Sequence, residues 1–264
     1  MSKAVIFPEP GYLGGKFSQV LPNLRSNAGW EIGNIELMRQ LREAGYSVDV
    51  WPCKVDKEHD IGLAIDHPLY DCDIPDKSMC VNLEPPVVRP RFFARFHGWP
   101  YKRILTHARP YVDERKAFYS PFPCIKYEGP LAPEKQAHPE ICAISSGDKT
   151  FDHPEAQYKN RRQAYLAFQK DIDVYGWGWH TDTELISKCN YLGPVDNKVF
   201  TLSRYKYALV FENQILEGYC TEKWWDCIQA GTEAIYRGWK PDYPIEDALP
   251  EKWAANIVKH LGEI

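Results

Sequence analysis

The pattern that decides the fold prediction lies in Tyr205–Gly238, which reads YKYALVFENQILEGYCTEKWWDCIQAGTEAIYRG. The apolar run Tyr207–Phe211 has the length and the residue types of a buried strand, and it stops at the polar trio Glu212–Gln214. Thr221 is a good N-cap, and the residues after it predict a helix over 222–230. The segment is therefore predicted to run from a buried strand through a polar loop into a helix.

The residues that follow complete a strand–helix–strand unit. Gly231 suits the end of the helix, and residues 234–236 predict the next strand. Ligands of such a unit bind beyond the carboxyl end of its first strand, facing the helix N-terminus. In the first helical turn, Lys223 suits a phosphate group, whereas Glu222 is better suited to accept hydrogen bonds from neutral hydroxyls. A sugar diphosphate offers both groups, and a pair of exposed surface charges is the alternative interpretation.

The same segment resembles the signature of the α-1,3/1,4-fucosyltransferases, which transfer L-fucose from GDP-fucose with inversion. The resemblance implies an α/β fold with two Rossmann-like domains that face each other across a cleft, the GT-B arrangement. The chain departs from the family pattern at Gln214, where serine is usual. The residues that carry the resemblance are Phe211-Glu212-Asn213, Tyr219, Thr221-Glu222-Lys223, Ala230-Gly231-Thr232 and Gly238.

The resemblance also implies how the donor is bound. Lys223 and the helix that starts at Thr221 are expected to stabilise the diphosphate. Glu222 and Asn213 are expected to orient the fucose hydroxyls or the ribose, and Tyr219 is expected to pack on the donor. These five residues, together with one arginine, form the predicted donor site.

The arginine comes from a second helix, predicted to begin near Lys159. Arg161 and Arg162 near its start oppose the helix dipole, so an anionic ligand or a salt bridge is expected beside them. The family has an Arg-x-Ala-aromatic motif whose arginine contacts the diphosphate. Since Arg162-Gln163-Ala164-Tyr165 fits this motif better than Arg161 does, Arg162 is assigned to the donor site.

The predicted catalytic base is Glu84. A short strand over 79–83 runs into Glu84-Pro85-Pro86, and prolines stiffen such a turn, so the carboxylate projects in a fixed direction. An exposed turn glutamate would give the same pattern. The resemblance favours the catalytic role, because the N-terminal domain of the family carries a glutamate before a similar turn.

Length and charge bound the remaining possibilities. With 264 residues, the chain is long enough for two domains, predicted as an acceptor-side domain over 1–130 and a GDP-fucose-binding domain over 131–264. A proline-rich passage at 121–133 marks the boundary. The net charge of −4 argues against nucleic acid as the main partner. The basic and aromatic stretch 89–115 is therefore predicted to be a solvated helix face or an acceptor-side surface.

Metal and disulfide signals are weak. Asp71–Asp73 and Asp171–Asp173 match an Asp-x-Asp metal pattern, but 36 acidic residues produce such matches by chance, and no metal or other cofactor is expected. The 8 cysteines form no Cys-x-x-Cys pair and are predicted to be buried free thiols. The N-terminal sequence has neither a signal peptide nor an apolar anchor, so a cytoplasmic protein without a membrane segment is expected.

The sequence thus predicts a metal-independent, inverting fucosyltransferase that moves L-fucose from GDP-fucose to a hydroxyl of a glycan acceptor. Glu84 is expected to take the proton of that hydroxyl. Two alternatives stay open: a glycosyltransferase that uses another nucleotide sugar, and a catalytically silent glycan-binding protein.

Overall fold

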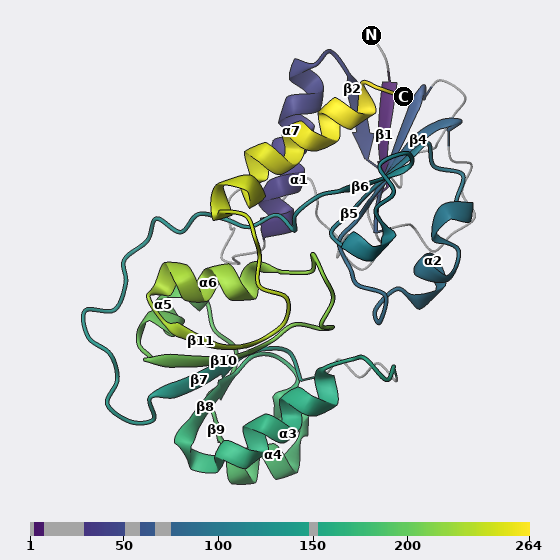
Figure 1. Cartoon of the computed structure of the whole chain (residues 1–264). Helices are drawn as coiled ribbons and strands as arrows, with labels where there is room; N and C mark the ends of the chain where they lie inside the picture. Colours follow the sequence, from purple (N-terminus) through teal and green to yellow (C-terminus); the bar gives the residue numbers. More distant parts are fainter. Residues whose placement is uncertain (1–2, 8–28, 51–58, 67–74, 148–152) are drawn as a thin grey trace.

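The computed structural model describes residues 3–7, 29–50, 59–66, 75–147 and 153–264. In this part of the chain the strands form two separate sheets, one of six strands and one of five, and all the pairings between named strands are parallel (Figure 1). The order in the first sheet is β2-β1-β3-β4-β5-β6. Its strands are β1 (Lys3–Phe7), β2 (Ser47–Val50), β3 (Ile61–Ile65), β4 (Lys77–Asn82), β5 (Arg103–Thr106) and β6 (Ala117–Tyr119).

The helices of the first domain follow from local sequence signals. Helix α1 (Gly29–Glu43) presents Leu37 and Leu41, one turn apart, to the core, where both are completely buried. Gly45 follows in the left-handed conformation with φ of +88°, which is typical of a glycine just after a helix. The shorter helices are α2 (Pro90–Ala94), η2 (Phe96–Gly98) and η3 (Arg109–Tyr111).

The second sheet has the order β11-β10-β7-β8-β9. The strand order therefore reverses between β7 and β10, and in open α/β sheets ligands bind outside the carboxyl ends of the strands at such a reversal. Ser145 follows β7 and Glu212 follows β10, so both lie at this position. The strands are β7 (Ile141–Ile144), β8 (Ile172–Tyr175), β9 (Asn190–Tyr191), β10 (Tyr207–Phe211) and β11 (Glu233–Arg237).

Helices cover both faces of the second sheet (Figure 1). On the first face, a core cluster contains Val199 and Cys227, which come from two neighbouring helices. On the other face, a second core cluster contains Tyr165 and Leu185. The helices on the first face are α5 (Lys198–Ser203) and α6 (Glu222–Ala230), and those on the other face are α3 (Tyr158–Phe168) and α4 (Thr183–Lys188). Three 3-10 helices complete this half: η4 (Gln169–Asp171), η5 (Trp179–Thr181) and η6 (Ile245–Ala248).

The last helix, α7 (Pro250–Leu261), returns to the first domain. It lies alongside α1 (Figure 1), and Trp253 and Ile257 share a core cluster with Leu37 and Leu41. A division near residue 130 separates the two sheets. It does not separate the two cores, because α7 completes the core of the first domain.

The stretch 89–115 differs from its prediction as a surface. Its aromatic residues Phe92, Phe93 and Phe96 are buried in a core cluster, since apolar rings gain more from burial than from solvent. Two of its arginines connect distant parts of the chain instead: Arg103 pairs with Glu263 and Arg109 pairs with Asp242.

Five cysteines confirm the prediction of buried free thiols: Cys124, Cys142, Cys189, Cys220 and Cys227. Cys80 is buried as well, while Cys53 and Cys72 lie outside the described ranges. Asp71–Asp73 lies outside them as well. Asp173 is held by hydrogen bonds from Gln136 and Tyr205. Among the residues that the structure describes, no group of three potential ligands could hold a metal ion, and no helix has the length and apolar character that a bilayer crossing needs.

Candidate donor-binding site

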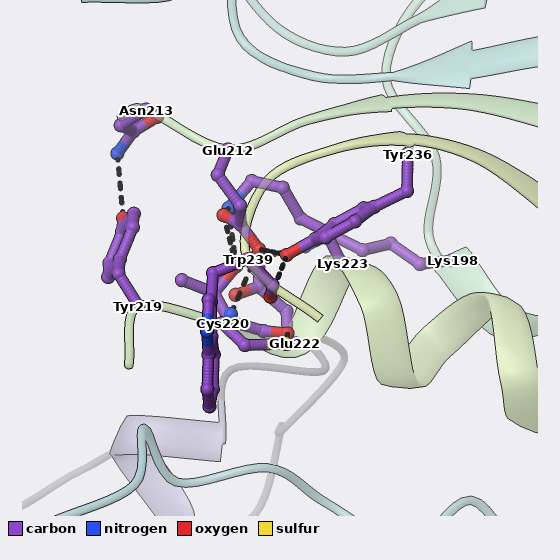
Figure 2. Close-up of polar contacts among 10 residues, drawn as sticks. Lys198, Glu212, Asn213, Tyr219, Cys220, Glu222, Lys223, Tyr236 and Trp239 are labelled. Atoms are coloured by element: carbon purple, nitrogen blue, oxygen red, sulfur yellow. Dashed lines mark hydrogen bonds and ion pairs between the residues drawn. The ribbon is translucent and has the colours of Figure 1, made fainter. Parts of the chain in front are cut away.

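Glu212 is the buried centre of the candidate site (Figure 2). Its side chain is 0% exposed and stands directly after β10. The carboxylate accepts hydrogen bonds from the backbone N–H of Thr221 at 2.9 Å, from its hydroxyl at 2.8 Å and from the Tyr236 hydroxyl at 3.0 Å. Lys223 Nζ lies 3.2 Å from it. A buried carboxylate is costly unless it is paired and hydrogen-bonded, so these contacts tie the end of β10 to the start of α6.

Thr221 occupies the predicted N-cap position of α6, but its side chain makes no capping hydrogen bond. Its hydroxyl bonds to Glu212 and accepts a hydrogen bond from Lys223 Nζ at 2.7 Å. Thr221 therefore supports the charged pair of Glu212 and Lys223, and its hydroxyl does not cover the first N–H groups of α6, which can receive an anion.

Glu222 and Lys223 are both charged in this network. Burial opposes the charge of Glu222, but Lys223 and Lys198 outweigh it and hold the pKa of the Glu222 carboxyl below its usual range. Burial also opposes the charge of Lys223, yet Glu212 and Glu222 hold its pKa above the usual value. The Glu222 carboxylate lies 3.1 Å from Lys198 Nζ and 3.7 Å from Lys223 Nζ. Since Lys223 remains 21% exposed, a ligand can reach it.

Asn213 and Tyr219 stand at the contact between the two domains. Asn213 Nδ2 donates to the Tyr219 hydroxyl at 3.3 Å (Figure 2). The Tyr219 ring packs at a tilt against the His107 ring of the first domain, with 4.6 Å between the ring centroids. Gly218 has φ of +85°, and a Cβ there would lie 2.1 Å from the His107 carbonyl, so only glycine fits. Tyr219 is 1% exposed and packs on protein, so its contact with the donor remains a prediction.

The two adjacent arginines of α3 have different surroundings. Arg162 Nε lies 2.5 Å from Asp182 and Arg162 Nη2 lies 2.8 Å from Glu184. These pairs occupy the guanidinium of Arg162 outside the network around Glu212.

Arg161 is the arginine of the candidate site. It is 3% exposed, donates to the carbonyl of Ser146 at 2.6 Å, and lies over the Tyr158 ring at 5.1 Å. Its charge opposes protonation of Lys223, so the two cations are close enough to interact. Arg161 is therefore the arginine whose charge acts on Lys223, and the assignment of Arg162 to the donor site remains a prediction.

Glu84 lies in the turn after β4, and its charge acts on two tyrosines of the second domain. Burial raises the pKa of the Tyr158 hydroxyl to about 12, and the negative charge of Glu84 is the second cause of this increase. The same two causes raise the pKa of the Tyr219 hydroxyl well above its ordinary value. The structure thus brings the predicted base near Tyr158 and Tyr219, which line the region of Arg161 and Asn213.

Gln214, the departure from the family pattern, joins the two domains beside this turn. Its Oε1 accepts a hydrogen bond from the backbone N–H of Val87 at 3.3 Å, three residues after Glu84. Its Nε2 donates to Glu155 at 2.5 Å. Serine is too short to make both contacts, so Gln214 adds a tie between the base-bearing turn and the second domain.

Asp226 is a buried carboxyl of α6 with incomplete pairing. It is 5% exposed, and its Oδ2 finds no hydrogen-bond partner among the residues described. Burial raises the pKa of Asp226 to about 7, although Lys198 attracts its charge. Because the folded pKa lies above the unfolded value, the folded protein holds this proton more tightly. The stability that this proton contributes is lost as the pH rises from about 4 to about 7.

Asp226→Asn removes the buried carboxyl, so we expect the variant to escape the loss of stability that wild type shows as the pH rises toward 7. The free energy of unfolding of the variant relative to wild type should rise between pH 5 and pH 8 by at most about 3 kcal/mol, because about two pKa units of the shift fall in this interval. Urea unfolding at both pH values measures it. Asp182→Asn is the matched control, because Arg162 holds the pKa of Asp182 below its ordinary value and this variant should lose stability at both pH values. An equal effect of Asp226→Asn at pH 5 and pH 8 would contradict the prediction.

These features define a class of protein. Two parallel α/β domains, joined by a last helix that returns to the first, form the GT-B glycosyltransferase fold. The chain is similar to the crystal structure of AviGT4, a glycosyltransferase involved in avilamycin A biosynthesis, with a TM-score of 0.52 and 13% identity. The alignment covers 100% of this chain and 98% of the AviGT4 chain.

Within that class, part of the sequence matches a family of fucosyltransferases. Residues 150–251 match the family described as glycosyltransferase family 10 (fucosyltransferase), C-terminal domain. This match lies within the second domain, and it confirms the predicted resemblance to the fucosyltransferases. The match contains Arg161, Glu212 and Lys223.

Two relatives carry the name GDP-fucose protein O-fucosyltransferase 3. The protein from Xenopus laevis is 36% identical over 107 residues, which are 40% of this chain and 21% of that relative. The protein from Mus musculus is 24% identical over 142 residues, which are 52% of this chain and 28% of that relative. The matched part of the chain thus spans less than a third of the length of either relative.

Proposed function

We propose that the chain transfers L-fucose from GDP-fucose to an acceptor hydroxyl with inversion and without a metal ion. One observation carries the proposal: in a family 10 fucosyltransferase domain, Arg161 and Lys223 form a cationic pair at the strand-order reversal. Glu84 faces this region from the other domain.

The cationic pair fits the diphosphate of the donor. Arg161, Lys223 and the N-terminus of α6 stabilise the negative charge that grows on the departing GDP, which is the differential binding of the transition state that catalysis needs. Glu212 keeps Lys223 charged and in place. Glu222 accepts hydrogen bonds from the neutral hydroxyls of the fucose or the ribose. Asn213 can accept hydrogen bonds from these hydroxyls or donate to them.

Glu84 acts as the general base. The acceptor oxygen attacks the anomeric carbon of fucose while the bond from that carbon to the diphosphate oxygen breaks. The proton of the acceptor hydroxyl passes to the Glu84 carboxylate. A positioned base of this kind contributes about 10²- to 10⁴-fold to the rate.

Two classes of acceptor are candidates. A glycan hydroxyl follows from the resemblance to the α-1,3/1,4-fucosyltransferases. A protein hydroxyl follows from the name of the Xenopus laevis and Mus musculus relatives, GDP-fucose protein O-fucosyltransferase 3. The tie through Gln214 holds the turn at Val87, three residues after the base.

A transfer assay tests the function. Labelled GDP-fucose is incubated with the chain and with a panel of glycans and folded proteins, and GDP, UDP and GDP-fucose are titrated by calorimetry. Transfer of label to a member of either panel, with binding of GDP but not UDP, supports the proposal. Binding of GDP without transfer or donor hydrolysis would indicate a catalytically silent protein. Preference for UDP would indicate another nucleotide sugar, and absence of nucleotide binding would contradict the whole assignment.

The two arginines of α3 provide a matched comparison. Arg161→Ala should lower the affinity for GDP by roughly 1.5–3 kcal/mol, the usual worth of a charged hydrogen bond, because Arg161 shares the site with Lys223. Arg162→Ala should leave GDP affinity unchanged, since Arg162 pairs with Asp182 and Glu184. Calorimetry with GDP measures both variants. A larger loss for Arg162→Ala would support Arg162 as the donor-site arginine, which the sequence motif predicts.

A further inference from the structure

Asp66, at the end of β3, contacts the turn that carries Glu84. It is 1% exposed and adopts φ of +54°, a left-handed conformation that is uncommon for residues other than glycine, asparagine and aspartate. Its backbone N–H donates to the carbonyl of Val81 on β4 at 2.8 Å. The backbone thus turns sharply at Asp66 and directs its side chain toward the end of β4.

One carboxylate oxygen of Asp66 holds the start of the turn. Oδ1 accepts hydrogen bonds from the backbone N–H groups of Leu83 at 2.6 Å and of Glu84 at 3.0 Å. Asn82 Nδ2 lies 3.4 Å from the same oxygen, and Asn82 Oδ1 accepts from the Thr106 hydroxyl at 3.1 Å. Neighbouring strands β3, β4 and β5 therefore all contribute to fixing the path of the chain into Glu84.

The second oxygen of Asp66, Oδ2, is buried and finds no hydrogen-bond partner within the described ranges. Burial and then the charge of Glu84 raise the pKa of Asp66 to about 7, while Arg89 acts in the opposite direction. The charge of Glu84 also raises the pKa of two tyrosine hydroxyls, those of Tyr158 on α3 and Tyr219 before α6. Two carboxyls that interact in this way titrate as a pair, so the protonation of each depends on the other.

We propose that Asp66 is a positioning residue for the general base: its carboxylate fixes the direction in which Glu84 projects, and its charge acts on that of Glu84. The proposal rests on the proposed function. Without the bonds to Oδ1, the turn between β4 and Pro85 can rotate, and a displacement of the base by about 1 Å is enough to lower turnover about 10²-fold.

Two substitutions separate the contributions of Asp66. Asp66→Gly accommodates φ of +54° but removes the carboxylate, and its kcat for fucose transfer should fall about 10- to 100-fold with the KM for GDP-fucose unchanged. Asp66→Asn keeps an acceptor oxygen for the two N–H groups and also tolerates this conformation. It should keep kcat within about threefold of wild type. The pH profile of its kcat should lack the change near pH 7 that ionisation of Asp66 produces in wild type, because the variant has no carboxyl at this position.

The outcomes distinguish this proposal from the proposed function. If wild type transfers fucose and Glu84→Gln abolishes transfer, while both Asp66 variants keep the kcat and the pH profile of wild type, the positioning role is overturned and the function stands. Parallel loss of kcat and GDP affinity in Asp66→Gly would show a general structural role and also overturn the proposal. If Asp66→Gly does not fold, the pH profile of Asp66→Asn decides. Wild type that transfers no fucose to any acceptor contradicts the function itself.

Discussion

Glu84→Gln is expected to lower kcat for fucose transfer by about 10²- to 10⁴-fold and to leave the affinity for GDP-fucose unchanged. Glutamine keeps the shape of the side chain and the backbone N–H that bonds to Asp66, but its amide cannot take up the acceptor proton. Initial rates of transfer and calorimetry with GDP-fucose measure the two effects separately.

Glu134→Gln is the control for this variant, because Glu134 is an exposed glutamate of the segment between the two sheets. It should behave as wild type in both measurements. Full activity of Glu84→Gln would show that another group accepts the proton. A parallel loss of donor affinity would instead show that Glu84 binds the donor.

Lys223→Ala should have two separable effects. Loss of a charged contact to the diphosphate should weaken GDP binding by roughly 1.5–3 kcal/mol. The variant also leaves Glu212, which is 0% exposed, without its cation, and breaking a buried ion pair typically costs about 3–5 kcal/mol of stability. The stability loss should fall near the lower end of that range, since Lys223 is 21% exposed and Thr221 and Tyr236 still bond to Glu212. Calorimetry with GDP and urea unfolding measure the two losses.

Adding Glu212→Gln to Lys223→Ala distinguishes these effects. The double variant has no buried charge left at this position, so it should recover most of the stability of the fold. It should not recover GDP affinity, because the cation that faces the phosphate is still missing. Recovery of both would show that Lys223 serves the fold alone.

The second domain was predictable because its local signals agree with one another. The apolar run of β10, the helix α6 and the strand β11 appear where the pattern predicts them, and Gly231 ends α6 with φ of +62°. The first domain gave weaker signals. Strand β3, with the sequence IGLAI, is buried along its whole length, so it lacks the alternation of a half-buried strand. The sequence pattern therefore predicts no strand at this position.

Two residues of the site show where motif matching was insufficient. Arg161 lies three residues after Tyr158 and four before Tyr165, and all three are on the buried face of α3. Helical periodicity therefore predicts the burial of Arg161, which the motif match does not. The sequence places Glu212 in the polar trio after the strand and in the family signature, but it predicts no separate role for this residue. Its burial depends on Tyr236 and Lys223, which reach it from other elements, so sequence spacing carries no direct signal of it.

The chain passes between the two domains twice, once between β6 and β7 and again between β11 and α7. Arg109 adds a side-chain link by pairing with Asp242. A body attached to another by two covalent connections cannot swivel freely about either one. We therefore expect any relative movement of the two domains to follow a hinge axis running through both connections. On the proposed function, such a movement would keep Glu84 and Lys223 on opposite domains of the same site while GDP-fucose enters and GDP leaves.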